Sequence, residues 1–217
     1  MDSTATALDV SPLCLGTNIF GWTADERESV AVLDAYVAAG HNFLDTADVY
    51  SAWADGHSGG ESETVIGAWL ARRRNRDRIV VATKVGHLGG LSRDNIRRRL
   101  DDSLRRLRTD YVDIYYLHAD VGDAPLQETL HTVDDEVRRG RVRHVGLSNF
   151  GSARVREAIE ICARDGLAPI RMLSPHYNLL ERDYERSLAA ICAANGIACV
   201  PYYGLARGFL TGKYRPG

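Results

Sequence analysis

Residues 112–148 read VDIYYLHADVGDAPLQETLHTVDDEVRRGRVRHVGLS and contain the repeating unit of the fold. Val112–His118 is apolar and rich in β-branched and aromatic residues, as is typical of a strand buried on both faces of a parallel sheet. Leu126–Arg138 is a helix candidate, and Gly140 after it suits a helix C-terminus. Val142–Ser148 is a second apolar run. Strand, helix and strand in this order predict a right-handed βαβ unit.

The same alternation continues in both directions along the chain. The runs expected as strands are Leu13–Thr17, Asn42–Thr46, Ile79–Lys84, Val112–His118, Val142–Ser148, Ile170–Ser174 and Ala198–Tyr202. The segments expected as helices are Glu26–Ala39, Glu61–Arg73, Ser92–Leu107, Leu126–Arg138, Ser152–Asp165 and Asp183–Ala194. An open doubly wound sheet shares this pattern, but no GxGxxG follows the first strand, which disfavours its dinucleotide-binding version.

We therefore predict an α/β fold of the (β/α)8 TIM barrel type. The barrel is expected to be incomplete here, with about seven strands and six helices and with the last βα unit absent. Residues 1–217 are expected to form a single barrel domain, truncated at the C-terminus.

Composition excludes several classes of protein. A hydrophobic content of 45% excludes a disordered chain, and a net charge of −2 gives no general attraction to nucleic acid or anionic lipid. No apolar stretch is long enough to span a membrane, and residues 1–10 lack a secretory signal pattern. The four cysteines show no metal-ligand spacing, so we expect no metal and a cytoplasmic, reducing location. Arg97–Arg99 begins a basic stretch that acidic residues interrupt, which indicates a solvated helix rather than a nucleic-acid site.

Polar side chains follow the apolar runs where a barrel carries its chemistry. Asp45 ends the second run and Tyr50 follows it, Lys84 ends the third and His118 ends the fourth. A phenol is a poor proton donor at neutral pH, and a neighbouring ammonium lowers its pKa. Lys84 can supply that charge, and Asp45 can keep Lys84 protonated. His118 can orient a carbonyl oxygen or relay the proton. This set suits protonation of an alkoxide that forms when hydride reaches a carbonyl group.

These residues lie in stretches that resemble the aldo-keto reductases. The matching stretches are Asn42–Tyr50, Ala82–Lys84, Leu117–His118, Gly146–Phe150, His176–Arg182 and Gly208–Tyr214. The resemblance implies a (β/α)8 barrel that reduces aldehydes or ketones to alcohols with NADPH. It implies Tyr50 as the general acid, with Asp45, Lys84 and His118 completing the catalytic tetrad. Only Lys84 and Lys213 are lysines in this arginine-rich chain, and both fall on functional positions of the family.

The resemblance also implies a cofactor site and a substrate site. Ser148 and Asn149 are expected to hold the nicotinamide carboxamide, Tyr202 to stack on its ring, and Lys213 to reach the phosphates. The full set expected to bind NADPH is Gly16, Thr17, Asn18, Asp45, Ser148, Asn149, Ser174, Tyr202, Tyr203, Gly204, Leu205, Ala206, Gly208 and Lys213. Ser174 stands where the family usually has glutamine, so we expect weaker nicotinamide binding. The substrate site is expected to include Trp22, Tyr50, Trp53 and His118, although the two tryptophans equally suit loop packing.

Other functions are compatible with the sequence. One is an NADPH-binding regulatory or redox-sensing subunit with little turnover, as in the related potassium-channel β subunits. A second is a lyase that forms a Schiff base on Lys84, which Tyr50 and Asn149 disfavour. A third is an inactive, truncated barrel. We expect a small carbonyl substrate and neither a nucleic-acid nor a membrane partner. The particular substrate, NADP over NAD, and the oligomeric state are not specified by the sequence.

Overall fold

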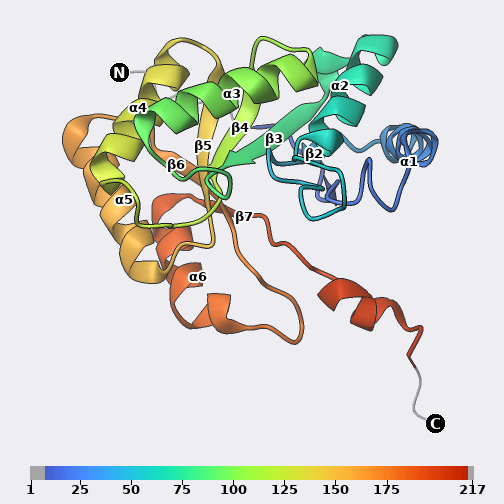
Figure 1. Cartoon of the computed structure of the whole chain (residues 1–217). Helices are drawn as coiled ribbons and strands as arrows, with labels where there is room; N and C mark the ends of the chain where they lie inside the picture. The colour runs from blue at the N-terminus through green and yellow to red at the C-terminus, as the bar shows by residue number, and fades with distance from the viewer. Residues whose placement is uncertain (1–7, 215–217) are drawn as a thin grey trace.

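The computed structural model describes residues 8–214, which form a curved parallel sheet covered by helices (Figure 1). The strands are β1 (Cys14–Gly16), β2 (Phe43–Asp45), β3 (Val80–Val85), β4 (Val112–Leu117), β5 (Val142–Ser148), β6 (Ile170–Ser174) and β7 (Ala198–Cys199). The α-helices are α1 (Glu26–Ala38), α2 (Glu61–Arg73), α3 (Arg93–Leu107), α4 (Leu126–Arg138), α5 (Ser152–Asp165) and α6 (Asp183–Asn195). Two short 3₁₀ turns lie at Arg76–Arg78 and Ala206–Thr211.

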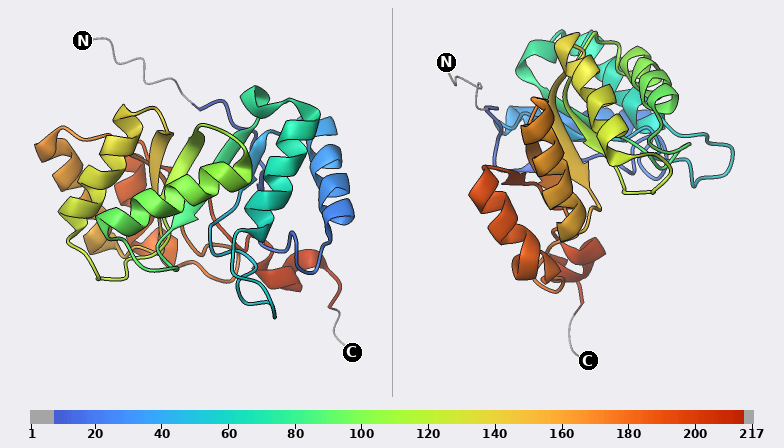
Figure 2. Two further views of the ribbon diagram at one scale, coloured as in Figure 1. Left: turned by 45° about the horizontal axis from the view of Figure 1, so that its top comes forward. Right: turned by 90° about the vertical axis from the view of Figure 1, so that its left-hand side faces the viewer.

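The strands pair in chain order from β1 to β7, and every pair is parallel. Each helix follows its strand and packs on the outer face of the curved sheet, as both views in Figure 2 show. This is the strand order of a (β/α)8 barrel, so the predicted fold class is confirmed for the part of the chain that the structure describes. Within residues 8–214, β1 and β7 stay at the two edges of the sheet.

The last strand is shorter than the sequence predicts. We expected Ala198–Tyr202, but β7 ends at Cys199. Pro201 has no N–H to donate to a neighbouring strand, so regular pairing stops before it. Tyr202 returns to the sheet through one isolated bridge to His176.

Side-chain alternation along the strands produces two apolar cores. Residues such as Leu44, Tyr115 and Leu147 point outward and pack under the helices in the larger core. The smaller core lies inside the curve of the sheet and contains Phe43, Ala82, Ile114, Tyr116 and Met172. The inward face of the strands is therefore also the face that carries Asp45 of β2 and Lys84 of β3.

Two glycines are required by close approach. A Cβ atom on Gly67 of α2 would lie 2.0 Å from the Arg106 carbonyl oxygen, so α2 packs directly on the backbone at the end of α3. A Cβ atom on Gly146 of β5 would lie 2.4 Å from the Tyr116 ring, which fills the space beside it. Both contacts fix how closely neighbouring elements pack.

The basic residues of α3 form ion pairs on the outside of the barrel. Arg97 pairs with Asp135 of α4 at 2.9 Å, and Arg106 pairs with Glu63 of α2 at 2.6 Å. The basic side chains of α3 therefore pair with acids of the neighbouring helices; Arg97 is partly exposed, whereas the pair of Arg106 with the fully buried Glu63 lies between α2 and α3. The four cysteines are free thiols. Among the described residues, no helix has the length and apolar character needed to cross a membrane.

Candidate active site

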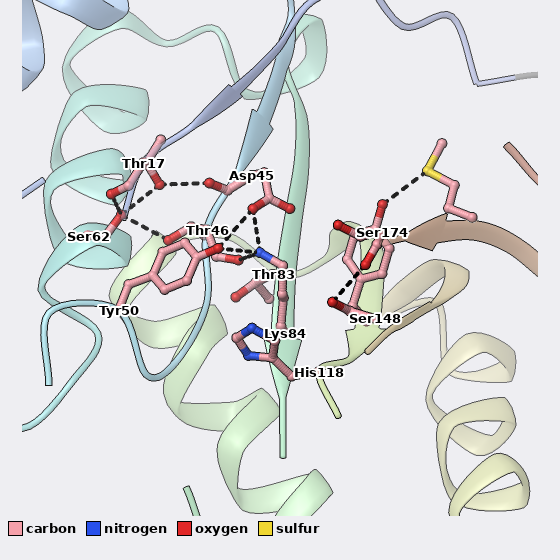
Figure 3. Close-up of polar contacts among 12 residues, drawn as sticks. Thr17, Asp45, Thr46, Tyr50, Ser62, Thr83, Lys84, His118, Ser148 and Ser174 are labelled. Atoms are coloured by element: carbon pink, nitrogen blue, oxygen red, sulfur yellow. Dashed lines mark hydrogen bonds and ion pairs between the residues drawn. The ribbon is translucent and has the colours of Figure 1, made fainter. Parts of the chain in front are cut away.

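The carboxyl ends of β2, β3 and β4 bring three of the predicted residues together. Asp45 is the last residue of β2, Lys84 lies near the end of β3, and His118 directly follows β4. Asp45 and Lys84 occupy inward-facing positions of adjacent strands, because alternate residues of a strand share one face. Tyr50 reaches the same point from the loop after β2 (Figure 3).

Lys84 is the centre of this group. Its Nζ pairs with the Asp45 carboxylate and donates to the Tyr50 hydroxyl at 2.7 Å and to the Thr46 carbonyl oxygen at 2.8 Å. The Tyr50 hydroxyl in turn donates to Asp45 Oδ1 at 3.1 Å. The Lys84 side chain is only 3% exposed, so its charge is balanced locally by Asp45. The phenol therefore lies between a buried ammonium and a carboxylate.

The pKa of Tyr50 corrects one part of the sequence analysis. We expected the Lys84 ammonium to lower it, but the pKa of Tyr50 is raised well above its ordinary value. Burial is the largest cause, followed by the charge of Asp45 and the hydrogen bond that the hydroxyl donates to it. The phenol is consequently protonated at neutral pH in this arrangement, which is the state that a proton donor requires.

His118 is neutral beside the phenol. Its ring centroid lies 6.2 Å from that of Tyr50, and its side chain is buried. Burial, the Lys84 charge and His87 lower the pKa of His118 to about 2. Its Nδ1 is buried and has no hydrogen-bond partner among the described residues. The ring of His87, from the loop after β3, packs against it edge to face at 4.2 Å.

A buried hydroxyl network fixes the end of β2. Thr17 Oγ1 donates to the Asp45 carbonyl oxygen at 2.8 Å and lies 2.8 Å from Ser62 Oγ. Thr46 Oγ1 also donates to Ser62 Oγ, at 3.0 Å (Figure 3). The Thr17 hydroxyl is thus already used in holding the strand that carries Asp45. Gly16 pairs with Asp45 in the sheet.

Asp48 lies in the same loop but points away from Lys84. Its side chain is 1% exposed, and neither carboxyl oxygen has a hydrogen-bond partner among the described residues. The nearest cation is Arg99, whose Nε lies 3.8 Å from Oδ2. Burial and the charge of Glu63 raise the pKa of Asp48 to about 7, against the opposing charges of Arg99 and Arg106. The Asp48 carboxyl group is therefore buried between the sheet and α3.

A second group of predicted residues meets at the ends of β5 and β6. Register places Ser148 opposite Ser174, and the Ser148 hydroxyl donates to the Ser174 carbonyl oxygen at 3.0 Å (Figure 3). The Asn149 amide donates to the His118 carbonyl oxygen at 2.8 Å and accepts from the Tyr202 hydroxyl at 2.7 Å. Asn149 therefore joins this group to the one around Lys84. Its φ of 57° is in the left-handed region, which asparagine tolerates better than most residues.

The Tyr202 ring is held in a fixed orientation beside this amide. It stacks on His176 with ring centroids 5.2 Å apart and planes 9° apart. Asn178 donates to the carbonyl oxygen of Tyr203 at 3.0 Å, which anchors the following residue. The flat ring of Tyr202 therefore lies next to the Asn149 amide, in the group that also contains the hydroxyls of Ser148 and Ser174.

The remaining predicted cofactor residues lie in the segment after β7. It runs from the sheet away from α4 and α5 and includes the turn Ala206–Thr211 (Figure 1). The Ala206 N–H donates to the Tyr203 carbonyl oxygen, and the N–H groups of Gly208 and Leu210 donate to that of Leu205, so three of its amides are used internally. Gly204 has open space where a Cβ would stand.

The basic side chains in the described part of this segment, residues 200–214, are Arg207 and Lys213. Lys213 is exposed and lies 5.2 Å from the Tyr214 ring, and the Arg207 guanidinium lies 4.6 Å from the Tyr203 ring. Within residues 8–214, neither side chain forms a hydrogen bond or an ion pair with Asp45, Tyr50, Lys84 or His118.

The two predicted substrate-binding tryptophans lie next to Tyr50. Trp22 and Trp53 meet edge to face at 5.7 Å, and Trp53 lies 6.2 Å from the Tyr50 ring. Trp22 is 46% exposed and Trp53 49% exposed, so their rings leave apolar surface open beside the phenol. Asn18, two residues after the end of β1, is half-buried.

Sequence reasoning missed four residues. His87 follows Lys84 by three positions, and a search of the whole loop after the strand, rather than its last residue, would have found it. His176 and Asp48 lie inside motifs that were quoted without assigning them a role. Arg207 is one of many arginines, and no feature of the sequence distinguishes it.

Comparison with known proteins places these observations in a family. A model described as the aldo/keto reductase family matches residues 12–217. The chain is similar to Protein tas of Escherichia coli, with 33% identity over 97% of this chain and 69% of that protein. It is 34% identical to norsolorinic acid reductase B of Aspergillus parasiticus, over 95% of this chain and 57% of the relative. It is also 34% identical to the uncharacterized oxidoreductase YrpG of Bacillus subtilis, over 96% and 67% respectively.

Proposed function

The chain belongs to the aldo/keto reductase family, and we propose that it reduces aldehydes or ketones to alcohols with NADPH, with Tyr50 as the proton donor. Family membership and the oxidoreductase names of its relatives support an oxidoreductase that acts on carbonyl groups with a nicotinamide cofactor. The observation that carries the finer proposal is the buried contact of the Tyr50 hydroxyl with both Lys84 and Asp45.

Tyr50 holds the proton that an alkoxide needs. Burial and Asp45 keep the phenol protonated before a substrate arrives, since both raise its pKa. As the proton leaves, the Lys84 ammonium 2.7 Å away faces the growing negative charge on the phenol oxygen and stabilises it. Asp45 balances the buried ammonium throughout. A positioned proton donor of this kind contributes about 10²- to 10⁴-fold to the rate.

His118 orients the carbonyl group. It is neutral, because its pKa lies far below physiological pH, so one ring nitrogen carries a hydrogen and can donate to a carbonyl oxygen. Its ring lies beside Tyr50, which supports the proposal that both side chains donate to one carbonyl oxygen. Two donors on one oxygen polarise the carbonyl carbon toward nucleophilic attack.

The donor set at β5 and β6 fits a nicotinamide ring. The Asn149 amide and the Ser148 hydroxyl are the partners that a carboxamide requires, because it has both donors and acceptors. Tyr202 supplies a flat, fixed ring, and Ser174 adds a buried hydroxyl. NADPH, when bound, supplies the hydride to the carbonyl carbon. Asn149 now bonds to His118, Ser148 and Tyr202 within the protein. A bound carboxamide would replace some of these partners.

The segment after β7 fits the phosphates of the cofactor. Within residues 200–214, Arg207 and Lys213 give this segment two positive charges, and a side chain at Gly204 would meet open space. We assign Tyr203, Gly204, Leu205, Ala206, Gly208 and Lys213 to this contact, with Arg207 added from the structure. Thr17, whose hydroxyl is used in the network at β2, is assigned to this site through its backbone only. Gly16 and Asn18 are the neighbours of Thr17 in the chain, at the end of β1, and we assign them to the same site.

The proposed function is tested by turnover. The chain is mixed with NADPH or NADH and a panel of aldehydes and ketones, and the reduced nicotinamide is followed by its absorbance. We expect carbonyl-dependent oxidation of NADPH and a lower rate with NADH. If tight NADPH binding occurs without turnover of any carbonyl compound in the panel, a sensing subunit describes the chain better than a reductase.

A further inference from the structure

The segments that lead from α2, α3, α4 and α5 into the next strands are strongly basic. Residues 72–78, 105–111, 138–143 and 164–171 contain fourteen arginines and three acidic residues, whereas the whole chain has a net charge of −2. Because the strands are parallel, these segments lie at the amino ends of β3 to β6, opposite the end that carries Tyr50 and Lys84. We call the four segments the basic rim. The basic rim is therefore a surface separate from the proposed active site.

Four arginines of the basic rim have no internal partner. Ten of the fourteen form ion pairs with acidic side chains. The other four are Arg74, Arg78, Arg108 and Arg171, which form neither an ion pair nor a side-chain hydrogen bond with any of residues 8–214. Arg74, Arg78 and Arg108 are exposed. Their guanidinium groups are therefore available to an external anion.

Two of these free arginines occupy positions that usually hold glycine. Arg74 and Arg108 end α2 and α3 with φ values of 51° and 54°, in the left-handed region. Gly166 and Gly196 hold the same positions after α5 and α6. A residue with a Cβ atom adopts this conformation at a cost in stability that glycine avoids. The last turns of α2 and α3 already contain two arginines each, so the helix dipoles do not require another cation. A role in stability therefore does not explain these two side chains.

The basic rim contains a shallow hollow between the ends of α3 and α4. Its volume is about 690 Å³, and its charged lining consists of Arg105, Arg108, Arg139, Arg141, Asp101 and Asp110. Four guanidinium groups against two carboxylates leave the hollow net positive. The planar guanidinium group binds two oxygens of one phosphate group at once. The hollow therefore suits a phosphate-bearing ligand beside Arg108.

The residue types of the basic rim disfavour two other kinds of partner. None of the exposed large apolar side chains of residues 8–214 lies in it, although protein interfaces centre on such side chains. Its one aromatic ring, Tyr111, has the Arg76 and Arg143 guanidinium groups 4.0 and 3.9 Å from its centroid. Two guanidinium groups this close must cover opposite faces of the ring, so Tyr111 has no face left for a nucleotide base. Binding of single-stranded nucleic acid depends on such stacking.

We propose that the basic rim binds an unbranched polyphosphate chain, with Arg74, Arg78 and Arg108 as its main contacts. Directly linked phosphate groups form a dense row of negative charges with no apolar part, which matches a surface rich in guanidinium groups and poor in apolar ones. Arginines spread over four neighbouring segments suit an extended chain better than a single ion. This inference does not depend on the proposed function, because the basic rim lies at the other end of the strands from Tyr50.

The test measures how tightly the chain binds an end-labelled inorganic polyphosphate, by fluorescence anisotropy. The proteins compared are wild type, Arg74→Gly, Arg108→Gly and the double variant. Glycine removes the guanidinium group and suits the left-handed backbone, so these variants are expected to melt no lower than wild type. Arg156→Ala is the matched control, because Arg156 is an exposed arginine near the start of α5, outside the basic rim, with no ion pair among the described residues.

We expect each glycine variant to bind polyphosphate about 2- to 5-fold more weakly than wild type, and the double variant about 4- to 25-fold more weakly. Arg156→Ala is expected to bind like wild type, and wild-type affinity is expected to fall steeply as salt is added. Glycine variants that bind as tightly as wild type overturn the proposal. An equal loss in Arg156→Ala also overturns it, since that result means that only the total charge of the chain matters.

Competition tests the chemical class of the ligand. Unlabelled polyphosphate, oligothymidylate and poly-glutamate are compared at equal concentrations of negative charge. We expect polyphosphate to displace the labelled chain at the lowest concentration. If oligothymidylate is equally effective, the surface binds a nucleic-acid backbone, and if poly-glutamate is equally effective, it binds any polyanion. Either result contradicts the proposal.

Discussion

Replacing Asp48 with asparagine tests the consequence of burying a carboxyl group that has no hydrogen-bond partner among the described residues. The carboxyl is 1% exposed, and its oxygens have no hydrogen-bond partner among residues 8–214. Its pKa rises from 3.8 to about 7 on folding. Because the folded state holds the proton to higher pH than the unfolded state does, stability falls as pH rises from about 4 to about 7. Asparagine resembles the protonated acid and cannot ionise.

The magnitude follows from that change in pKa. Each pKa unit corresponds to about 1.4 kcal/mol, so the full loss of stability from Asp48 is about 4 kcal/mol above pH 7. Roughly 2 to 3 kcal/mol of it falls between about pH 5 and about pH 8. The free energy of unfolding of Asp48→Asn, relative to wild type, is therefore expected to rise by that amount over this range.

Urea unfolding followed by circular dichroism at several pH values measures this difference. Asp55→Asn is the matched control, because Asp55 is an exposed acid of the same loop. We expect the control to show no such rise. The contrary result is a difference in free energy of unfolding between Asp48→Asn and wild type that stays the same at every pH. Asp48 would then not ionise within this range, and the reasoning about its burial would be wrong.

Two further predictions concern the packing that supports the site. Gly67→Ala is expected to destabilise the chain by about 1 to 3 kcal/mol, since its methyl group would meet the backbone at Arg106 and Leu107, and a thermal melt that matches wild type would contradict this. Glu63→Ala is expected to lower the free energy of unfolding, measured in urea, by about 3 to 5 kcal/mol, because it leaves the Arg106 guanidinium and the buried Thr83 hydroxyl without their partner. A loss below about 1 kcal/mol would show that water replaces the carboxylate.

The arrangement of strands and helices could be predicted from the sequence because each apolar run is followed by an amphipathic segment and a turn. The nearness of Asp45 and Lys84 also follows from sequence, since both lie at the carboxyl ends of strands that are adjacent in a parallel sheet. Pro201 marks the early end of β7, but the run around it is apolar enough to obscure that signal. These features depend on local pattern, which a single sequence contains.

The missed features depend on packing between distant residues. The direction of the Tyr50 pKa requires the burial of the phenol to be weighed against the charges of Lys84 and Asp45, and burial is not visible in the sequence. Asp48 looks like an ordinary loop acid beside Asp45, yet it lies under α3. The contact of His87 with His118 joins two loops whose relative positions only the folded barrel defines.

The central claim is that Tyr50 donates the proton, and Tyr50→Phe tests it most directly. Reduction of benzaldehyde by NADPH is measured alongside NADPH affinity. Tyr116→Phe is the control, because Tyr116 is an inward-facing phenol of β4. Among the described residues, its hydroxyl has only the Met172 sulfur, at 3.6 Å, as a hydrogen-bond partner. We expect Tyr50→Phe to lose about 10²- to 10⁴-fold in kcat while NADPH affinity stays near the wild-type value and the control remains active. A Tyr50→Phe variant that turns over at the wild-type rate would contradict the account.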